Sequence, residues 1–320
     1  MPAGSEALQN NARKGIVFVI VGMFCISAND MLIKHLSGNY PLHEMVFVRS
    51  VFGLMISLII VQFEGGFTIL RTNRIGLQTL RGLLMVMANL TFFSALAVVP
   101  LADATAIFFV APLFITLMSI FFLGEKVGPR RFIAVAVGFA GVLAMLRPGS
   151  AHSSGSPGTL VLLLPVAAAF GYAAVQILTR KLGVSSKASA LAVYMQLTFI
   201  AVSCGFWFVT GDGRYGEGQD SEILIFLLRA WTWPSASDWP LFGLLGLLSA
   251  LVGYTISQAY RSADAATIAP FEYVALPMSI FWGWAMFGEL PGLRVMFGVL
   301  LIAGSGLYVF LRERKKSGPG

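Results

Sequence analysis

Glu272 is a carboxylate inside a segment that is apolar enough to cross a bilayer, Ala269-Pro270-Phe271-Glu272-Tyr273-Val274-Ala275-Leu276-Pro277. An acid at membrane depth is costly unless it is paired, hydrated or neutralised, so such residues face a bundle interior or a watery cavity. The flanking prolines cannot donate backbone hydrogen bonds, and broken backbone at this depth is tolerated only against protein or a cavity. The sequence predicts a substrate or proton contact at Glu272, with a structural pair to Arg49 or Lys34 as the alternative.

Asp30 and Asn89 are further polar residues within apolar segments. Asp30 is four residues before Lys34, a favourable spacing for a helical ion pair. The residue is therefore either a local partner of Lys34 or a substrate or proton contact. Asn89 is either a hydrogen-bonding link between helices or a substrate ligand. Phe93, one turn later, is a packing residue or part of a stacking platform.

Arg49 and two Tyr/Gln pairs complete the candidate site. Arg49 is either half of a structural ion pair or an anchor for an anionic substrate, because guanidinium binds carboxylate and phosphate in bidentate fashion. Tyr172 and Gln176 are one helical turn apart, and Tyr254 and Gln258 repeat this spacing. These pairs could hydrogen-bond a polar heterocycle or amide, or they could simply lie near the membrane interface.

Composition and periodicity indicate the elements that carry these residues. Of 320 residues, 57% are hydrophobic and 12% charged, against roughly 25% charged in soluble domains. We identify ten apolar segments of about 20 residues, the length that crosses a hydrocarbon core. They are residues 15–36, 42–63, 77–97, 101–122, 130–147, 159–178, 188–209, 240–260, 264–287 and 293–311.

The distribution of Lys and Arg predicts the orientation of these spans. If both termini are cytoplasmic, most of the 22 basic residues lie on the cytoplasmic side, as the positive-inside rule requires. Arg81 is counted among them, in the second loop. The basic residues assigned to the opposite side are Lys34, Arg147, Arg214, Arg229 and Arg294. The net charge of +7 is thus explained by topology, and nucleic acid is not an expected partner.

The chain also repeats itself. Ala102-Asp103-Ala104 opens an apolar span that ends at Gly124-Glu125, and Ala263-Asp264-Ala265 opens another that ends at Gly288-Glu289. We predict an all-α membrane protein with two inverted repeats of five helices, over 15–147 and 159–312, joined by a Gly/Ser/Pro linker over 148–158. Inverted repeats are typical of alternating-access carriers, whose sites lie near the midplane between the halves.

These features resemble the EamA domains of the drug/metabolite transporter superfamily. The resemblance rests on Gly124-Glu125 followed by Gly128-Pro129-Arg130-Arg131, and on Ala269–Tyr273 followed by Phe287-Gly288-Glu289. Its second repeat is similar to bacterial carriers for S-adenosylmethionine and riboflavin uptake. The resemblance implies a multi-pass protein of the bacterial inner membrane, with a central cavity lined by spans 1, 3, 4, 6, 8 and 9.

The residues favour a secondary transporter of a small organic metabolite over other classes. No Gly-rich phosphate loop, metal-binding spacing or Ser/His/Asp pattern is evident, so we expect no cofactor, no metal and no enzymatic activity. Cys25 and Cys204 are interpreted as packing residues. Residues 210–239 are predicted to form a loop with an interfacial helix and a Trp belt, or a lid. H⁺ is a possible coupling ion. The alternative function is export of amino acids or amphiphilic metabolites. The sequence is compatible with both a monomer and a homodimer.

Overall fold

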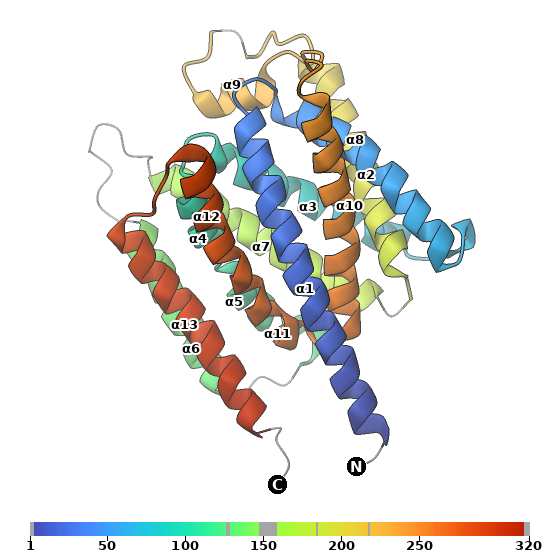
Figure 1. Ribbon diagram of the computed structural model, residues 1–320, viewed down its shortest axis with the longest axis vertical. Coiled ribbons are helices and arrows are strands. Elements are labelled where there is room, and N and C mark those ends of the chain that lie inside the picture. Colours follow the sequence, from blue (N-terminus) through green and yellow to red (C-terminus); the bar gives the residue numbers. More distant parts are fainter. Residues whose placement is uncertain (1–2, 126–128, 147–158, 184, 217, 317–320) are drawn as a thin grey trace.

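The computed structural model is built from helices packed along one long axis (Figure 1). It describes residues 3–125, 129–146, 159–183, 185–216 and 218–316, so the predicted linker over 148–158 lies outside the described residues. Within those ranges every regular element is helical, as the composition predicts. The first residues of α1 and the last residues of α13 lie at the same end of the molecule.

The helices follow the predicted spans closely. In the first half these are α1 (Ala3–Leu36), α2 (Leu42–Glu64), the 3₁₀ turn η1 (Phe67–Leu70), α3 (Ile75–Leu96), α4 (Leu101–Phe108), α5 (Ala111–Met118), the π-turn η2 (Ser119–Leu123) and α6 (Pro129–Leu146). In the second half they are α7 (Thr159–Leu182), α8 (Ala188–Thr210), α9 (Glu222–Leu228), α10 (Trp239–Ser262), α11 (Ala265–Ile268), the 3₁₀ turn η3 (Ala269–Val274), α12 (Ala275–Phe287) and α13 (Leu293–Lys316).

Seven helical segments within the described residues are long and apolar enough to cross a membrane, when α4, α5 and η2 are taken together. The protein is therefore a multi-pass membrane protein. The remaining predicted spans correspond to α6, to α13 with an apolar part over Leu293–Ser305, and to the α11–η3–α12 segment. The count of ten spans in two inverted repeats stays a prediction.

Two of the predicted spans are broken. The first changes from α4 to α5 just before Pro112, and the second changes from α11 through η3 to α12 around Pro270. Proline lacks a backbone N–H and crowds the preceding turn, so neither segment continues as one regular α-helix. Both segments end at a glycine with positive φ, Gly124 at 68° and Gly288 at 65°, a conformation in which a Cβ is disfavoured.

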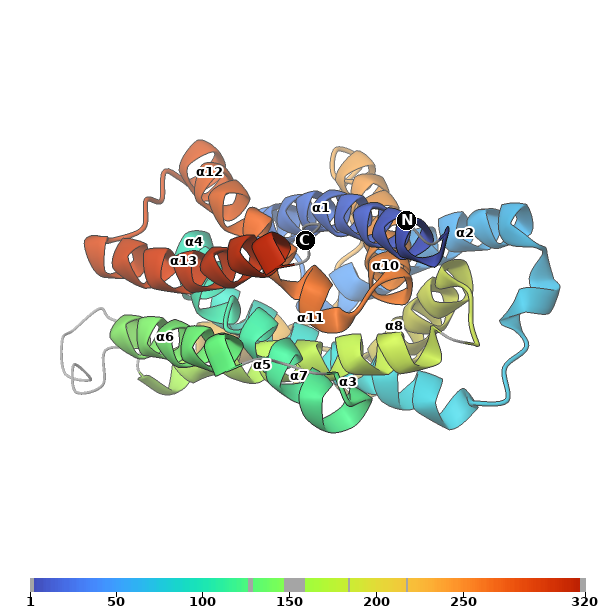
Figure 2. The same cartoon turned by 90° about the horizontal axis from the view of Figure 1, so that it is seen from below.

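The helices form a closed ring when seen along the long axis (Figure 2). Its neighbours in order are α1, α10, α2, α8, α3, α7, the α4–α5 segment and α12, which returns to α1. α6 and α13 pack against each other at one side. The order brings helices from both halves of the chain around one interior.

Glycines allow the closest helix contacts in this ring. A Cβ on Gly246 of α10 would lie 2.2 Å from the Phe52 Cβ of α2, and a Cβ on Gly22 of α1 would lie 2.5 Å from Ile256 of α10. Small residues at such crossings let membrane helices approach closely. Large apolar side chains are exposed on the outside, Phe63 and Leu293 among them at 87% and 90%.

Candidate functional site

The ring encloses a cavity of about 130 Å³. One water needs roughly 10–15 Å³ of such space, so the cavity has room for several waters or a small organic group. Side chains from α1, α2, α3, α4, α7, α8, α10 and the η3–α12 segment line it. Its polar and charged lining residues are Ser27, Asn29, Asp30, Arg49, Arg81, Asn89, Thr105, Tyr172, Gln176, Gln196, Ser249, Ser257, Glu272 and Ser279.

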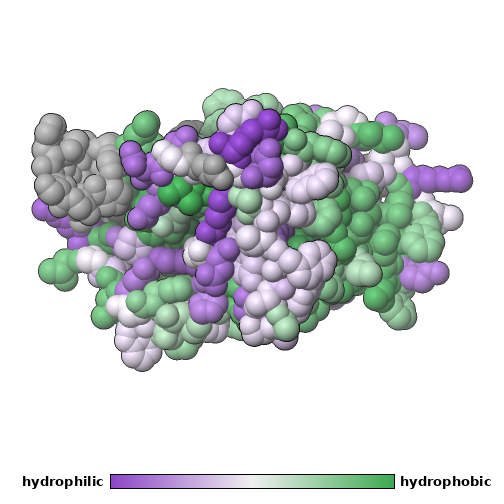
Figure 3. Space-filling view, turned by 90° about the horizontal axis from the view of Figure 1, so that it is seen from above, coloured by the Kyte–Doolittle hydropathy of each residue, from purple (hydrophilic) through white to green (hydrophobic). Residues whose placement is uncertain are grey.

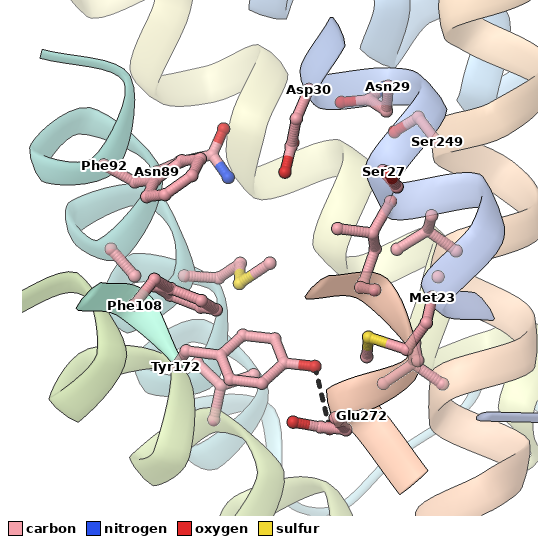
Figure 4. A pocket seen from close by; sticks show the side chains of 18 of the residues that line it. Met23, Ser27, Asn29, Asp30, Asn89, Phe92, Phe108, Tyr172, Ser249 and Glu272 are labelled. Atoms are coloured by element: carbon pink, nitrogen blue, oxygen red, sulfur yellow. Dashed lines mark hydrogen bonds between the residues drawn. The ribbon is translucent and has the colours of Figure 1, made fainter. Parts of the chain in front are cut away.

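Glu272 is held at one end of this cavity by two tyrosines. Its Oε1 accepts hydrogen bonds from the hydroxyl of Tyr172 at 3.1 Å and from that of Tyr260 at 2.7 Å. The carboxyl is 1% exposed, and it lies in η3, two residues after Pro270, where the regular α-helix is interrupted. Figure 4 shows Tyr172 and Glu272 facing each other across the lower part of the cavity. The arrangement places an ionisable group on the cavity wall with neutral donors as partners.

Arg49 organises the opposite end. Its guanidinium donates to Asn29 Oδ1 at 2.9 Å and to Asn89 Oδ1 at 2.6 Å. The same group lies over the rings of Phe93 and Phe199, 5.9 and 5.2 Å from their centroids. Asp30 and Asn89 point into this upper part of the cavity in Figure 4. Arg49 thus links α1, α2 and α3 through neutral amides and aromatic faces.

Aromatic rings form one side of the cavity between these two ends. Phe108 packs edge-on against Phe92 and against Tyr172, with centroid separations of 5.2 and 5.4 Å. These residues come from α3, α4 and α7 and lie on the same side in Figure 4. A flat aromatic solute would find ring edges and faces here, as binding sites for small molecules commonly provide.

Several buried polar atoms on the cavity wall have no hydrogen-bond partner within the described part of the chain. They are Ser27 Oγ, Asn29 Nδ2, Arg49 Nε, Thr105 Oγ1 and Gln176 Oε1. Buried polar groups are almost always satisfied by protein, water or ligand. These unsatisfied donors and acceptors indicate that the cavity binds water or a polar solute.

Most residues that the sequence singled out lie on this wall. Asp30, Arg49, Asn89, Phe93, Tyr172, Gln176 and Glu272 all do. Tyr254 and Gln258 do not: the Tyr254 hydroxyl donates to Glu64 Oε1 at 3.0 Å, and Gln258 Oε1 accepts from Arg261 at 2.8 Å. Their roles as substrate ligands stay predictions that the cavity geometry does not favour.

The expected ion pairs form elsewhere. Lys34 binds Glu289 at 2.8 Å instead of Asp30, and Glu272 binds the two tyrosines instead of Arg49 or Lys34. Lys34 also lies 5.0 Å from the centroid of Phe287. The spacing of Asp30 and Lys34 on one helix is compatible with an ion pair. Lys34 instead binds Glu289, which follows α12 and comes within reach because α12 packs on α1.

Three important residues were missed or misplaced by the sequence reasoning. Tyr260, a partner of Glu272, is fully buried near the end of α10, and no motif distinguished it from Tyr254. Arg81 was assigned to a cytoplasmic loop, but it is 3% exposed in α3 and lines the cavity. Its position inside the segment 77–97 was the available signal. The third is Glu289, which was noted only as part of a repeated motif.

Glu125 and Glu289 join the two halves of the chain. Glu289 Oε2 accepts from the backbone N–H of Leu101, the first residue of α4, at 3.0 Å. Glu125 Oε1 accepts from the backbone N–H of Ala265, the first residue of α11, at 3.1 Å. Each carboxylate follows one broken segment and caps the start of the other. Negative charge at a helix N-terminus satisfies a free N–H and is favoured by the helix dipole.

The comparisons with known proteins agree with this architecture. Residues 13–147 match the EamA-like transporter family. A riboflavin transporter of Brucella anthropi is 28% identical over 84% of this chain and 88% of its own length. An S-adenosylmethionine uptake transporter of Rickettsia bellii is 26% identical over 94% of both chains. Residues 13–147 thus match a domain of the EamA-like transporter family, and distant relatives named as transporters align over most of the chain.

Two further similarities extend over most of the transporter. A pseudopaline exporter of Pseudomonas aeruginosa is 25% identical over 91% of this chain and 94% of its own length. One solved crystal structure has the same fold, with a TM-score of 0.65 and 19% identity over 98% of this chain and 99% of that one. The relatives are transporters and not enzymes. The protein is a membrane transporter of small metabolites, and its relatives are bacterial.

The transporter carries a long loop between α8 and α10 that packs on the turn between α1 and α2. Arg229 donates to the carbonyls of Ser37, Gly38 and Tyr40, and Glu44 Oε2 accepts from the backbone N–H of Thr232 at 3.0 Å. Figure 3 shows this end of the molecule, where polar side chains gather across the middle of the face and apolar ones extend along the flank. No described residue of this loop lines the cavity.

Tyr40 ties the same loop to the start of α10. Its hydroxyl donates to Asp238 Oδ2 at 2.7 Å and accepts from the backbone N–H of Ser235 at 3.0 Å. The hydrogen bonds from Tyr40 and then Ser235 lower the pKa of Asp238 from its usual value. Trp233, five residues before Asp238, is 85% exposed. An exposed Trp beside a spanning helix is typical of the membrane interface.

Proposed function

We propose that this transporter carries a small organic metabolite through its central cavity by alternating access, driven by protonation of Glu272. The observation that carries the proposal is the carboxyl of Glu272 on the cavity wall, held by Tyr172 and Tyr260. Ionisable groups buried in a membrane protein are costly, face the bundle interior or a water-filled cavity, and mark ion or substrate pathways.

The two halves are proposed to form inverted repeats of five spans each. If the halves are repeats, α1, α2 and α3 correspond to α7, α8 and α10. The contacts support this correspondence, because α1 packs on α10, its counterpart α7 packs on α3, and α2 packs on its own counterpart α8. The carboxylates of Glu125 and Glu289 cap the opposite broken segments in the same way. A two-fold relation between halves, with a site between them, lets one rocking motion open the cavity to either side of the membrane.

Protonation of Glu272 would change what this wall can bind. As a carboxylate, Glu272 accepts bonds from both tyrosines and can attract a donor or cation in the cavity. As a neutral acid, it gains a donor of its own and loses its attraction for a cation. Substrate and proton would therefore compete for, or share, the same group, which is the condition for coupled transport.

The substrate proposed is a flat, polar metabolite of the riboflavin or S-adenosylmethionine class, taken up from outside the cell. The aromatic side formed by Phe92, Phe108 and Tyr172 supports a planar ring, and the unmade hydrogen bonds of Asn29 and Gln176 support a solute with polar edges. The name of the Rickettsia bellii relative, an S-adenosylmethionine uptake transporter, favours uptake. The similarity to a pseudopaline exporter makes export of an amphiphilic metabolite the second candidate.

The membrane orientation is proposed from charge. With both termini cytoplasmic, Arg13 and Lys14 are cytoplasmic and exposed, as the positive-inside rule favours. The loop between α8 and α10 is then outside. The protein is proposed to reside in the bacterial inner membrane.

Transport by purified protein in proteoliposomes tests the function. Riboflavin and S-adenosylmethionine are offered with imposed pH or sodium gradients, and wild type is compared with Glu272→Gln and with Glu222→Gln, an exposed acid in α9. We expect proton-driven transport in wild type and Glu222→Gln and none in Glu272→Gln, with equal membrane expression. Normal, still pH-dependent transport by Glu272→Gln would refute the coupling role, and failure of that variant to accumulate would instead indicate a structural pair.

A further inference from the structure

Arg81 is a buried cation on the cavity wall whose protein partners are all neutral. Its Nε donates to Thr179 Oγ1 at 2.7 Å, its Nη1 to the Leu191 carbonyl at 3.0 Å and its Nη2 to Ser257 Oγ at 3.3 Å. These acceptors belong to α7, α8 and α10, so the guanidinium lies where three helices meet α3. The side chain is 3% exposed.

The charge of Arg81 has no acidic partner within the described residues. The ion pairs recorded there join Lys34 with Glu289, Arg180 with Asp264 and Arg214 with Asp212. Glu272, the acid at this end of the cavity, is bound by tyrosines. Removing an unpaired charge from water costs several kcal/mol of free energy. Water or an anion beside the buried guanidinium would offset this desolvation.

Arg81 also has bonding capacity left over. A guanidinium carries five N–H groups in a fixed fork, and the protein uses three of them. The two that remain are one on each terminal nitrogen. Such a pair matches the two oxygens of a carboxylate or phosphoryl group.

The other cavity arginine has different neighbours. The charge of Arg49 lies over Phe93 and Phe199, and two amide oxygens accept its bonds. Asn89, one of these partners, is eight residues beyond Arg81 in α3, or roughly 12 Å along the helix axis. Arg81 is thus a separate cation near the end of the cavity that faces the chain termini.

We propose that Arg81 binds an acidic group of the transported solute, a carboxylate or a phosphoryl group, at this end of the cavity. The inference rests on the proposed function, because it requires that the solute occupies the central cavity. It narrows the substrate class: a metabolite that carries a carboxylate, such as S-adenosylmethionine, is favoured over riboflavin, which carries no anionic group. Thr179, Leu191 and Ser257 hold the guanidinium in place and leave its free edge to the solute.

Binding of matched ligand pairs to the purified protein tests this assignment. One pair is S-adenosylmethionine and its decarboxylated form, and the other is riboflavin 5′-phosphate and riboflavin. Hydrogen bonds to charged groups contribute about 1.5–3 kcal/mol, so wild type should prefer the acidic member of at least one pair by about tenfold or more. Arg81→Gln should lose this preference and bind the member without the carboxylate or phosphate at least as tightly as wild type does.

Two further variants separate ligand binding from a structural tie. Thr179→Val removes one partner of Arg81 but keeps its charge, so it should lower thermal stability and reduce the preference less than Arg81→Gln does. Arg81→Lys keeps a charge but lacks the planar fork of N–H groups, so it should weaken binding of the member with the carboxylate or phosphate more than binding of the other member. If Arg81→Gln cannot be purified, Arg81→Lys decides, and equal weakening of both members would overturn the assignment.

A preference for the acidic member that persists in Arg81→Gln would also overturn it. If none of the four compounds binds wild type, the proposed substrate class fails, and Arg81 is tested separately with acetate and inorganic phosphate at constant ionic strength. These anions should raise the thermal midpoint of wild type more than that of Arg81→Gln or Arg81→Lys. Equal responses in wild type and variant would show that Arg81 is a structural tie only.

Discussion

Glu125 and Glu289 each cap the broken segment in the opposite half of the chain. Glu125 accepts from the first N–H of α11 at 3.1 Å, and Glu289 accepts from the first N–H of α4 at 3.0 Å. Glu289 additionally holds Lys34. Both caps therefore connect one broken segment directly to its counterpart in the other half. This reciprocal pair of bonds connects the two halves that form the cavity, in addition to the bonds from Arg81 to Thr179 and Ser257.

Removal of either cap should destabilise the protein by a similar amount. Loss of a helix N-cap costs about 0.5–2 kcal/mol, so we expect Glu125→Ala and Glu289→Ala to lower the thermal midpoint in detergent. Glu222→Ala is the control, since Glu222 is exposed in the first turn of α9. Midpoints equal to wild type in both variants would argue against the connection.

The tyrosines that hold Glu272 should be needed for transport. Tyr172→Phe and Tyr260→Phe each remove one hydrogen bond to the carboxyl, and a bond to a charged group contributes about 1.5–3 kcal/mol. We expect each variant to transport at a rate reduced by about tenfold or more. Tyr254→Phe is the matched control because this hydroxyl binds Glu64 away from the cavity. An equal loss in all three variants would point to general destabilisation.

A side chain at Gly246 should prevent α10 from packing on α2. A Cβ there would lie 2.2 Å from the Phe52 Cβ and 3.2 Å from the Arg49 carbonyl. Overpacking costs about 1–3 kcal/mol or more, so Gly246→Val should reduce the folded yield and thermal midpoint. Gly243→Val, one turn earlier in the same helix, meets nothing within 4 Å and should be tolerated. Similar yields from the two variants would contradict the crossing.

The loop between α8 and α10 should loosen in acid. The pKa of Asp238 is lowered in the folded protein, chiefly by the Tyr40 hydroxyl, so its contribution is present above the unfolded pKa of about 4. That contribution is lost as pH falls through the lower folded value. Trp239 fluorescence should therefore change below about pH 4 in wild type, and the change should be absent in Asp238→Asn and in Tyr40→Phe. A transition that persists unaltered in both variants would exclude this contact as its cause.

Labelling of single cysteines tests the orientation. After replacement of Cys25 and Cys204, a cysteine at Ser317 should react only from the cytoplasmic side and one at Ser221 only from outside. The expectation follows from the basic residues on the side of the termini. Reaction of Ser317→Cys with an impermeant reagent in intact cells would invert the orientation.

The class of this protein and the position of its central acid could be predicted from the sequence. The apolar segments are long enough to need a bilayer, and a carboxylate between Pro270 and Pro277 can persist there only against protein or a cavity. The breaks in both proline-containing segments and the positive-φ glycines after them followed from local chemistry, which depends only on neighbouring residues.

Tertiary structure alone decided which groups meet. Lys34 pairs with Glu289, 255 residues away, and not with Asp30 four residues away, because the packing of α12 on α1 brings that carboxylate within reach. Tyr260 and not Tyr254 binds Glu272, although both are on α10. These two tyrosines are six residues apart, which places their side chains about 120° apart around the helix axis. A helix that is apolar on all sides has no sequence pattern that marks the face toward the cavity. The same holds for Arg81. Its sequence position suggests a basic residue of a cytoplasmic loop, and only the packing of α7, α8 and α10 against α3 places it on the cavity wall.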